Sequence, residues 1–342
     1  MMADLTSLTG DHNFVGLPGL GVENLYLKLE HLNPSGSIKF KTALGLIGSC
    51  EDAGIIRNDT ILIESSSGNL GVALSVICAA RGYSFTCVVD PNVNAQNVER
   101  MKALGTNVVR ITEEDENGGF LGTRLAYIRG LLASDSRYHW LNQYENPANA
   151  AIHAKTTAKA IDVAFDRLDY LFVGVGTAGT LMGCIQRFAR TRPHLKIVAV
   201  DSAGSVTFGL PPGKRYIPGL GSSQPPKIFR PDGLHALVTV PEEAAVATCR
   251  HLACRSGILA GGSTGTVLSA VQAWRDRFTA SDVVVAIAPD GGTPYLGTIY
   301  DDAWVSERLG PEALAAWPEN PALARCVTVT PRIIDTKEAQ HA

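Results

Sequence analysis

A lysine that follows a tight turn is the first residue with an evident chemical use. Lys39 ends the segment NPSGSIK, which begins at Asn33, and it opens an apolar-periodic stretch typical of a helix. Pro34 and Gly36 favour a turn in front of that helix. The positive end of a helix dipole favours a neutral amine at this place, and a neutral lysine is what Schiff-base chemistry needs. The alternative is an ordinary solvated lysine.

Small hydroxyl side chains gather at a second joint between a strand and a helix, ESSSGNLG, which begins at Glu64. Ser66, Ser67 and Gly68 offer hydroxyls and backbone N–H groups at a helix start, which suits a carboxylate. Asn69 can hydrogen-bond a ring oxygen. Simple helix capping by one of the serines is the competing interpretation.

The third joint is GVGTAGT, residues 174–180. Small residues let the backbone approach an anion, and the N–H groups of a helix start bind phosphate. The stretch also matches GxGxxG, and Asp201 ends the next predicted strand about twenty residues later, which is the dinucleotide pattern. A nicotinamide enzyme is therefore a second hypothesis at this point.

The fourth joint is GGSTG, residues 261–265, in which Ser263 could contact a heterocyclic nitrogen or simply cap a helix. Together the four segments offer an amine, an anion nest, a phosphate cradle and a neutral polar group. Pyridoxal phosphate needs a lysine for its aldehyde, a cradle for its phosphate and a partner for its ring nitrogen. A nicotinamide dinucleotide needs no lysine, so the combination favours pyridoxal phosphate.

All four segments lie where a strand is followed by a helix, because β-rich runs and helical patterns alternate along the chain. We expect strands at Leu25–Glu30, Thr60–Glu64, Ser84–Asp90, Asn107–Thr112, Tyr170–Val175, Lys196–Asp201, Ala236–Val240 and Asp282–Ala288. We expect helices near 39–53, 69–81, 94–104, 119–133, 149–166, 178–190, 241–256, 264–278 and 295–308. This order predicts an α/β protein with parallel sheets, whose ligands lie at the carboxyl ends of the strands.

The strand–helix units fall into two groups. One spans 45–145, the other combines 1–44 with 146–330, and 331–342 form a tail. Between Gly204 and Gly233 the chain has six prolines and six glycines in thirty residues and no periodic pattern. A loop of this length inside a compact domain is usually functional or disordered.

Composition restricts the class of protein further. The chain has 342 residues, 45% of them hydrophobic, and a net charge of −3, so nothing draws it toward nucleic acid or an anionic membrane. No apolar run approaches the ~20 residues of a membrane span, and the first ten residues lack the pattern of a signal peptide. The seven cysteines include no CxxC pair, which indicates reduced thiols in a cytoplasm and no zinc site. We expect a cytoplasmic protein without nucleic-acid, membrane or metal partners.

In order and spacing, the four segments resemble the β-family of pyridoxal-phosphate enzymes (fold type II), of which cysteine synthase is a member. The resemblance extends from about Leu25 to Tyr300. It implies two three-layer αβα domains with mainly parallel sheets, the domain over 45–145 being smaller, mobile and on the substrate side. It also implies pyridoxal phosphate as cofactor, amino acids as substrates and a homodimer.

The same resemblance assigns roles to single residues. Lys39 looks like the catalytic Schiff-base lysine, Asn69 like the partner of the phenolic oxygen and Ser263 like the partner of the pyridine nitrogen. The phosphate cradle corresponds to Gly176, Thr177, Ala178, Gly179 and Thr180. The site for the substrate α-carboxylate corresponds to Ser66, Ser67, Gly68 and Gln143. A serine leaves the pyridine nitrogen unprotonated, which favours elimination of a β-leaving group over transamination.

Four stretches, SSSGNLG, GGFLGTR, AGSVTFG and RYIPGLGSS, are closer to one subgroup of that family. The subgroup joins O-phospho-L-serine to L-glutamate in siderophore and antibiotic pathways. The resemblance implies β-replacement that gives N-(2-amino-2-carboxyethyl)-L-glutamate, a precursor of 2,3-diaminopropionate, and phosphate. Arg124 is expected to bind the leaving phosphate, with Arg129, Lys214 and Arg215 as substitutes.

Leu70 marks a departure from the best-known members, because cysteine synthases usually have a threonine directly after the asparagine. The substitution removes a hydroxyl at this position, which argues against cysteine synthesis. Cysteine synthesis from O-acetylserine (or O-phosphoserine) and sulfide is the alternative function.

Overall fold

The computed structural model describes residues 4–115 and 119–329. Contacts along the chain divide it into two units, one of residues 1–9 and 33–152 and the other of 10–32 and 153–342. Residues 4–9, 33–44 and 146–152, which we expected in the larger group, thus fall in the smaller unit. The reason is local packing, because the helix that starts at Lys39 lies on the following helix and Ile152 lies against Gly45. The tail expected over 331–342 lies outside the described residues.

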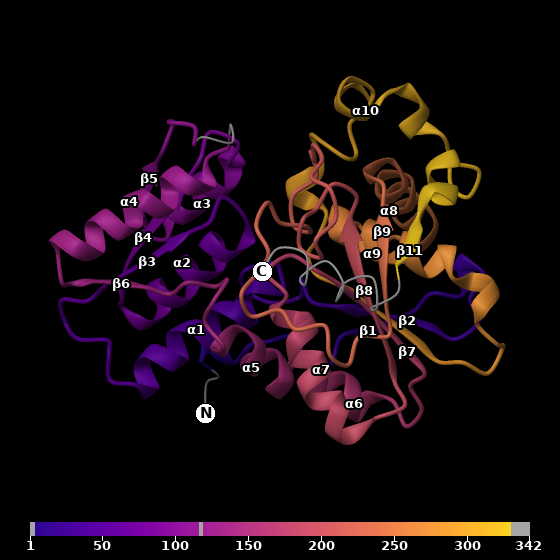
Figure 1. Cartoon of the computed structure of the whole chain (residues 1–342), viewed down its shortest axis with the longest axis horizontal. Coiled ribbons are helices and arrows are strands. Elements are labelled where there is room, and N and C mark those ends of the chain that lie inside the picture. The colour runs from indigo at the N-terminus through magenta and orange to yellow at the C-terminus, as the bar shows by residue number, and fades with distance from the viewer. Residues whose placement is uncertain (1–3, 116–118, 330–342) are drawn as a thin grey trace. The chain divides into compact units, whose positions relative to one another are not determined.

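The first unit is built on a parallel sheet in the order β5-β4-β3-β6 (Figure 1). Its strands are β3 (Ile61–Ser65), β4 (Ser84–Val89), β5 (Asn107–Arg110) and β6 (Tyr138–Trp140). Its helices are α1 (Lys39–Asp52), α2 (Asn69–Arg81), α3 (Ala95–Ala103) and α4 (Leu121–Ser134). Helix α5 (Ala148–Lys155) crosses the boundary to the second unit.

The two faces of this sheet bury different side chains. Leu62 and Phe85 point to the face that α1, α2 and α3 cover, where they join Leu46 and Leu74 in one apolar cluster. The alternate residues Ile63 and Val88 point to the other face and pack against Ile128 of α4. Because successive strand residues face opposite sides, the near-continuous apolar runs of β3 and β4 require helices on both faces. The unit therefore has three layers.

The second unit has a sheet in the order β1-β2-β10-β7-β8-β9-β11. Its strands are β1 (Phe14–Gly16), β2 (Leu25–Leu29), β7 (Tyr170–Gly174), β8 (Lys196–Ser202), β9 (Ala236–Val240), β10 (Val284–Ala288) and β11 (Val327–Val329). The five central strands run parallel, and the edge strands β1 and β11 run antiparallel to their neighbours. The expected α/β class with mainly parallel sheets is confirmed.

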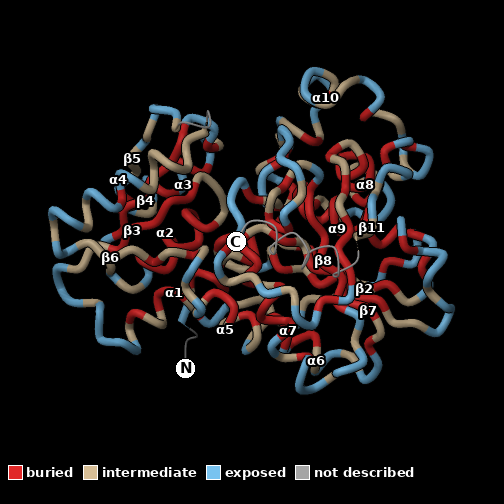
Figure 2. Tube along the Cα trace, in the orientation of Figure 1, coloured by how far each residue is buried: buried red, intermediate tan, exposed pale blue. Residues whose placement is uncertain are grey.

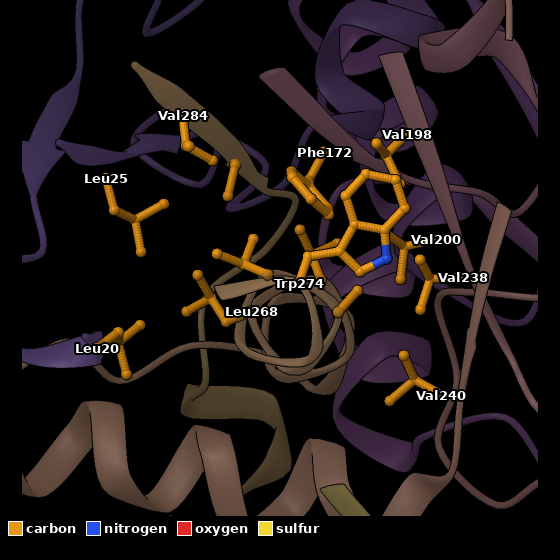
Figure 3. Packing of buried hydrophobic residues seen from close by; sticks show 14 of the residues in the cluster. Leu20, Leu25, Phe172, Val198, Val200, Val238, Val240, Leu268, Trp274 and Val284 are labelled. Carbon is orange, nitrogen blue, oxygen red and sulfur yellow. The ribbon is translucent and has the colours of Figure 1, made fainter. Parts of the chain in front are cut away.

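Helices cover the central strands of this sheet on both faces. They are α6 (Thr157–Ala164), α7 (Gly179–Thr191), α8 (Glu242–Ser256) and α9 (Gly262–Ala273), with α10 (Asp302–Leu309) further along the chain. Trp274 and Leu268 pack among Phe172, Val198 and Val238 in the largest apolar cluster (Figure 3). Figure 2 shows the same pattern along the trace, with the strand interiors buried and the outer loops exposed.

Three short strands and three helices differ from the sequence expectations. The helix expected over 264–278 runs from Gly262 to Ala273. β1, β6 and β11 have three residues each, too few to show alternation in a sequence. The helix expected over 149–166 is broken at Thr156, whose backbone is not helical. The helix expected from 295 starts only at Asp302, because a short 3-10 turn that contains Pro294 comes first. No helix of the described residues combines the length and apolar character that crossing a membrane requires.

Candidate active site

Lys39 is the first residue of α1, and it is half-buried. The side chain of Asn33 closes the loop in front of it. Asn33 Oδ1 accepts hydrogen bonds from the backbone N–H of Ser35 at 3.0 Å and of Gly36 at 3.1 Å, and Asn33 Nδ2 donates to the carbonyl of Ser37 at 2.8 Å. Gly36 has a φ of +78°, which glycine adopts without strain. These bonds set the point at which α1 starts, and thus the position of Lys39.

The serine loop, Ser65–Gly68, joins the end of β3 to the first residue of α2, Asn69. The hydroxyl of Ser66 accepts hydrogen bonds from the backbone N–H of Gly71 at 3.1 Å and of Gly68 at 3.4 Å. This hydroxyl therefore caps the helix. A Cβ at Gly71 would lie 2.8 Å from Cys87 Sγ, so the first turn of α2 packs directly on β4. The serine loop is held firmly at both ends.

Ser67 lies in a network with Asp90 and Arg124. Its hydroxyl donates to Asp90 Oδ2 at 2.9 Å and accepts from Arg124 Nη1 at 3.1 Å, and the Asp90 backbone N–H also donates to it at 3.1 Å. Arg124 and Asp90 form an ion pair at 3.2 Å, with side chains 12% and 11% exposed. Arg124 thus lies beside the serine loop, and Asp90 already balances part of its charge.

Gln143 lies in the loop after β6, next to the serine loop, because β6 is the neighbour of β3. The backbone N–H of Gln143 donates to Glu64 Oε2 at 3.1 Å, and its carbonyl accepts from Asn149 Nδ2 at 2.8 Å. Gln143 is 6% exposed, and its side-chain oxygen has no hydrogen-bond partner among the described residues. Asn142 has a φ of +50°, so this loop bends sharply just before Gln143.

The predicted phosphate cradle lies in the second unit, between the end of β7 at Gly174 and the start of α7 at Gly179. Ala178 has a φ of +64°, and this left-handed residue turns the chain into the helix. A Cβ at Gly176 would lie 3.0 Å from the carbonyl oxygen of Gly219, so the cradle is narrow there. Thr177 is buried, and Thr180 Oγ1 lies 3.5 Å from His153 Nε2. The backbone N–H groups of this helix start can bind a phosphate.

Ser263 is the second residue of α9 and is 2% exposed. Gly219, with a φ of +112°, lies so close to the Ser263 hydroxyl that any side chain at 219 would collide with it. The carbonyl of Gly219 also faces Gly176. The turn that carries Gly219 therefore contacts both of the predicted cofactor segments of this unit. A hydrogen bond from the Gly221 N–H to the Val175 carbonyl at 2.8 Å holds it in place.

The surroundings of Asp201 argue against a dinucleotide site. It is 2% exposed, its Oδ1 accepts from the Ser202 N–H at 2.8 Å, and it also hydrogen-bonds the hydroxyls of Ser205 and Thr207. Burial raises the pKa of Asp201 to about 7. A carboxylate enclosed in this way cannot reach a ribose, so its role is to organise the loop that follows β8.

The substitutes considered for Arg124 have other surroundings. Arg215 donates to the Leu220 carbonyl at 3.2 Å and to Ser223 Oγ at 3.4 Å, so its guanidinium lies within the turn that carries Gly219. Lys214 places its ammonium 4.9 Å from the centre of the Tyr216 ring. Arg129 is exposed on α4.

Glu64, Asp90 and Gly219 were not among the site residues expected from the sequence. Glu64 and Asp90 lie at the carboxyl ends of adjacent parallel strands, which is a position where ligands bind, so the predicted sheet could have indicated them. Nothing local marks Gly219, because its importance comes from contact with Gly176 and Ser263.

Comparison with known proteins decides the family. The family model described as pyridoxal-phosphate dependent enzyme matches residues 6–290. The chain belongs to this family. The resemblance inferred from the four segments is thereby confirmed, pyridoxal phosphate is the cofactor, and the nicotinamide hypothesis is excluded.

Three relatives give finer comparisons. An N-(2-amino-2-carboxyethyl)-L-glutamate synthase of Ralstonia nicotianae is 40% identical over 299 residues, which is 86% of this chain and 88% of the relative. The crystal structure of O-ureido-L-serine synthase has a TM-score of 0.81 at 29% identity and covers 90% of this chain and 99% of its own. An O-acetylserine dependent cystathionine β-synthase from Helicobacter pylori has a TM-score of 0.80 at 27% identity, over 88% and 99% of the two chains.

The residues of this pyridoxal-phosphate enzyme fit its cofactor. By the resemblance, the helix start after β7, narrowed by Gly219, corresponds to the phosphate site, and the buried hydroxyl of Ser263 corresponds to the partner of the ring nitrogen. The half-buried Lys39 corresponds to the partner of the aldehyde, and Asn69 to the partner of the phenolic oxygen. The chemistry of these groups suits those roles.

Proposed function

We propose that the chain catalyses β-replacement on O-phospho-L-serine with L-glutamate as the amine nucleophile. The products are N-(2-amino-2-carboxyethyl)-L-glutamate and phosphate, as a step toward 2,3-diaminopropionate for a siderophore or antibiotic. The observation that carries this proposal is the 40% identity with the Ralstonia nicotianae synthase over nearly nine-tenths of each chain. The stretches shared with that subgroup include the serine loop of the first unit and the turn around Gly219 of the second unit.

The chain's own residues have distinct tasks in this reaction. Bound pyridoxal phosphate withdraws electrons from the substrate's α-carbon, which makes its proton acidic. The Lys39 amine, once displaced from the cofactor by the substrate, takes that proton and later returns it. The substrate α-carboxylate binds at Ser66, Ser67, Gly68 and Gln143. The Ser67 hydroxyl already donates to Asp90, whereas the Ser66 hydroxyl only accepts hydrogen bonds from Gly68 and Gly71. The Ser66 O–H and the backbone N–H groups of this loop are therefore the donors proposed for the carboxylate.

The leaving phosphate needs a cation, and Arg124 lies beside the serine loop. A phosphate dianion would compete with Asp90 for the guanidinium, which can donate along two edges. We therefore propose that Arg124 contacts the leaving group while Asp90 holds its other edge. Asn69 and Ser263 set the position and the electron demand of the cofactor ring.

Cysteine synthesis is the second candidate. The Helicobacter pylori neighbour is O-acetylserine dependent, which supports the donor of this candidate but not its sulfide nucleophile. Leu70 argues against cysteine synthesis. The Leu70 side chain is 2% exposed and lies in the apolar cluster of the first unit, so position 70 supplies no hydroxyl to the site.

The decisive experiment is mass spectrometry of the products formed from O-phospho-L-serine and from O-acetyl-L-serine, each with glutamate and with sulfide. We expect N-(2-amino-2-carboxyethyl)-L-glutamate from phosphoserine plus glutamate as the fastest reaction. Cysteine as the main product, with no glutamate adduct, would replace the proposal by the second candidate.

Compartment and assembly complete the proposal. We propose a cytoplasmic location, which is supported by seven cysteines that form no disulfide among the described residues, five of them buried. We also propose a homodimer, on the family resemblance alone. Light scattering on the purified holoenzyme tests the second statement, and cell fractionation tests the first.

A further inference from the structure

Glu64 is a buried carboxylate to which the proposed reaction gives no task. It is the fourth residue of β3 and 2% exposed. Its Oε1 accepts hydrogen bonds from the Ser65 N–H at 2.8 Å and from Trp140 Nε1 at 3.2 Å, and its Oε2 accepts from the Gln143 N–H at 3.1 Å. One carboxylate thus joins three segments, namely the start of the serine loop, strand β6 and the loop after β6.

The topology explains why this position is special. β3 lies between β4 and β6, so the loops at its carboxyl end border the loops of both neighbours. On the β4 side, Asp90 holds Ser67. On the β6 side, Glu64 holds the backbone of Gln143, and Asn149 holds the Gln143 carbonyl at 2.8 Å. The two segments proposed to bind the α-carboxylate are therefore tied to each other through Glu64.

Glu64 is also in an unusual electrostatic situation. Burial raises the pKa of Glu64 to about 7, although its N–H donors act in the opposite direction. Ionising a buried acid at this place costs desolvation free energy, and an apolar residue would not have this cost. Nearby, the Gln143 side-chain oxygen is buried without a hydrogen-bond partner among the described residues. Both features suit a rigid polar site for a ligand better than they suit a stable core.

We propose that Glu64 is a positioning residue for the amino-acid substrate. It holds the Gln143 loop and the serine loop in one register, so that both contact the same α-carboxylate. The inference rests on the proposed function for the identity of the donor substrate. It does not depend on which β-leaving group that substrate carries.

The test is Glu64→Gln. An amide has a single oxygen, so either the Gln143 N–H or the Ser65 and Trp140 donors would face an NH2 group, and one of the two loops would be released. The Kd of the holoenzyme for L-serine, read from the change in cofactor absorbance, should rise about tenfold to a hundredfold, the usual effect of losing a hydrogen bond to a charged group. The KM for the donor should rise similarly, whereas kcat and cofactor content should stay within about threefold of the parent.

Glu51→Gln is the matched control in the same unit. Glu51 pairs with Arg81 at 2.7 Å and accepts from the Tyr83 hydroxyl, at a distance in sequence from both loops. The same chemical change there should leave the Kd for L-serine unaltered. Trp140→Phe removes one donor to Glu64 and keeps the aromatic ring, so it should raise the Kd in the same direction by a smaller factor. If Glu64→Gln does not fold, the Kd of Trp140→Phe for L-serine tests the positioning role of Glu64 instead.

An unchanged Kd in Glu64→Gln would overturn the inference, and so would a loss of cofactor and kcat at an unchanged Kd, because that pattern belongs to a purely structural residue. If Glu64→Gln does not fold, an unchanged Kd in Trp140→Phe overturns it. The proposed function fails separately, when the parent protein binds L-serine normally but forms no glutamate adduct from phosphoserine.

Discussion

Lys39 and Lys41 lie on the first turn of α1 in different surroundings. Lys39 is half-buried, whereas Lys41 is fully enclosed in the first unit with no exposed surface. An amine that must exchange a covalent partner with each incoming substrate needs access to that substrate. The structure therefore supports Lys39, which the NPSGSIK segment already favoured, as the reacting lysine.

Replacing Lys39 tests this choice directly. The parent protein should be yellow, and borohydride should fix the cofactor to Lys39, as peptide mass spectrometry would show. Lys39→Ala should lose the borohydride-dependent adduct and essentially all turnover, because no other amine takes the α-proton. Persistence of a lysine adduct together with turnover in Lys39→Ala would assign the role to another residue.

In the proposed reaction, the hydroxyl of Ser263 is the partner of the cofactor's pyridine nitrogen. Ser263→Asp would hold a proton on the pyridine nitrogen, which deepens the electron sink and favours long-lived carbanions. We expect slower β-replacement and a higher ratio of α-proton exchange in D2O to phosphate release. Ser263→Ala is the control, because it changes the contact with Gly219 without adding a charge. Equal ratios in Ser263→Asp and the parent would mean that Ser263 does not face the ring nitrogen.

Among the helices, α4 carries the residue that we propose recognises the leaving group of the substrate. It lies on the side of the sheet opposite to α2, yet its first turns bring Arg124 to the serine loop, where Ser67 and Asp90 meet it. Arg124 supports the loop, and in the proposed reaction it also contacts the phosphate, so a substitution removes both contacts together. Only the second contact depends on the leaving group.

A comparison of donors separates the two contacts. In Arg124→Ala, kcat/KM with O-phospho-L-serine should fall by about two to four orders of magnitude, because one partner of a buried charge pair is removed. The loss with O-acetyl-L-serine should be far smaller, since the acetyl ester is uncharged. Both are measured at saturating glutamate. If both donors lose equally, Arg124 supports the serine loop only, and the phosphate contact would have to come from another cation.

At the scale of the whole molecule, buried carboxylates make stability depend on pH. The pKa of Asp201 rises on folding from 3.8 to about 7, so the native state holds its proton more tightly than the unfolded chain. The contribution of this proton to the free energy of unfolding is complete below the pKa of Asp201 in the unfolded chain, 3.8, and is lost as the pH rises through about 7. Asparagine has no proton to lose. The free energy of unfolding of Asp201→Asn, compared with that of the parent at the same pH, should therefore increase from pH 5 to pH 8.

Urea unfolding of the holoenzyme at the two pH values measures this change. The expected gain is at most about 3 kcal/mol, from about 1.4 kcal/mol per pKa unit over that range. Asp135→Asn is the control, because the Arg137 side chain lowers the pKa of Asp135 to about 2 and this group stays ionised throughout. A stability difference between Asp201→Asn and the parent that does not change with pH would mean that Asp201 is already ionised at pH 5.

The fold class, eight strands to within about two residues, and the four loops that carry Lys39, Asn69, the predicted phosphate cradle and Ser263 could all be predicted from the sequence. This is possible because hydrophobic periodicity and turn residues are local properties of a chain. The partners of the polar groups in those loops could not be predicted, because they come from other strands and helices. Ser67 meets Asp90 across 23 residues and Arg124 across 57, and Glu64 meets Gln143 across 79, so these contacts depend on which strands are neighbours. A hydroxyl offered by the sequence is available to a ligand only when no such neighbour has already bound it.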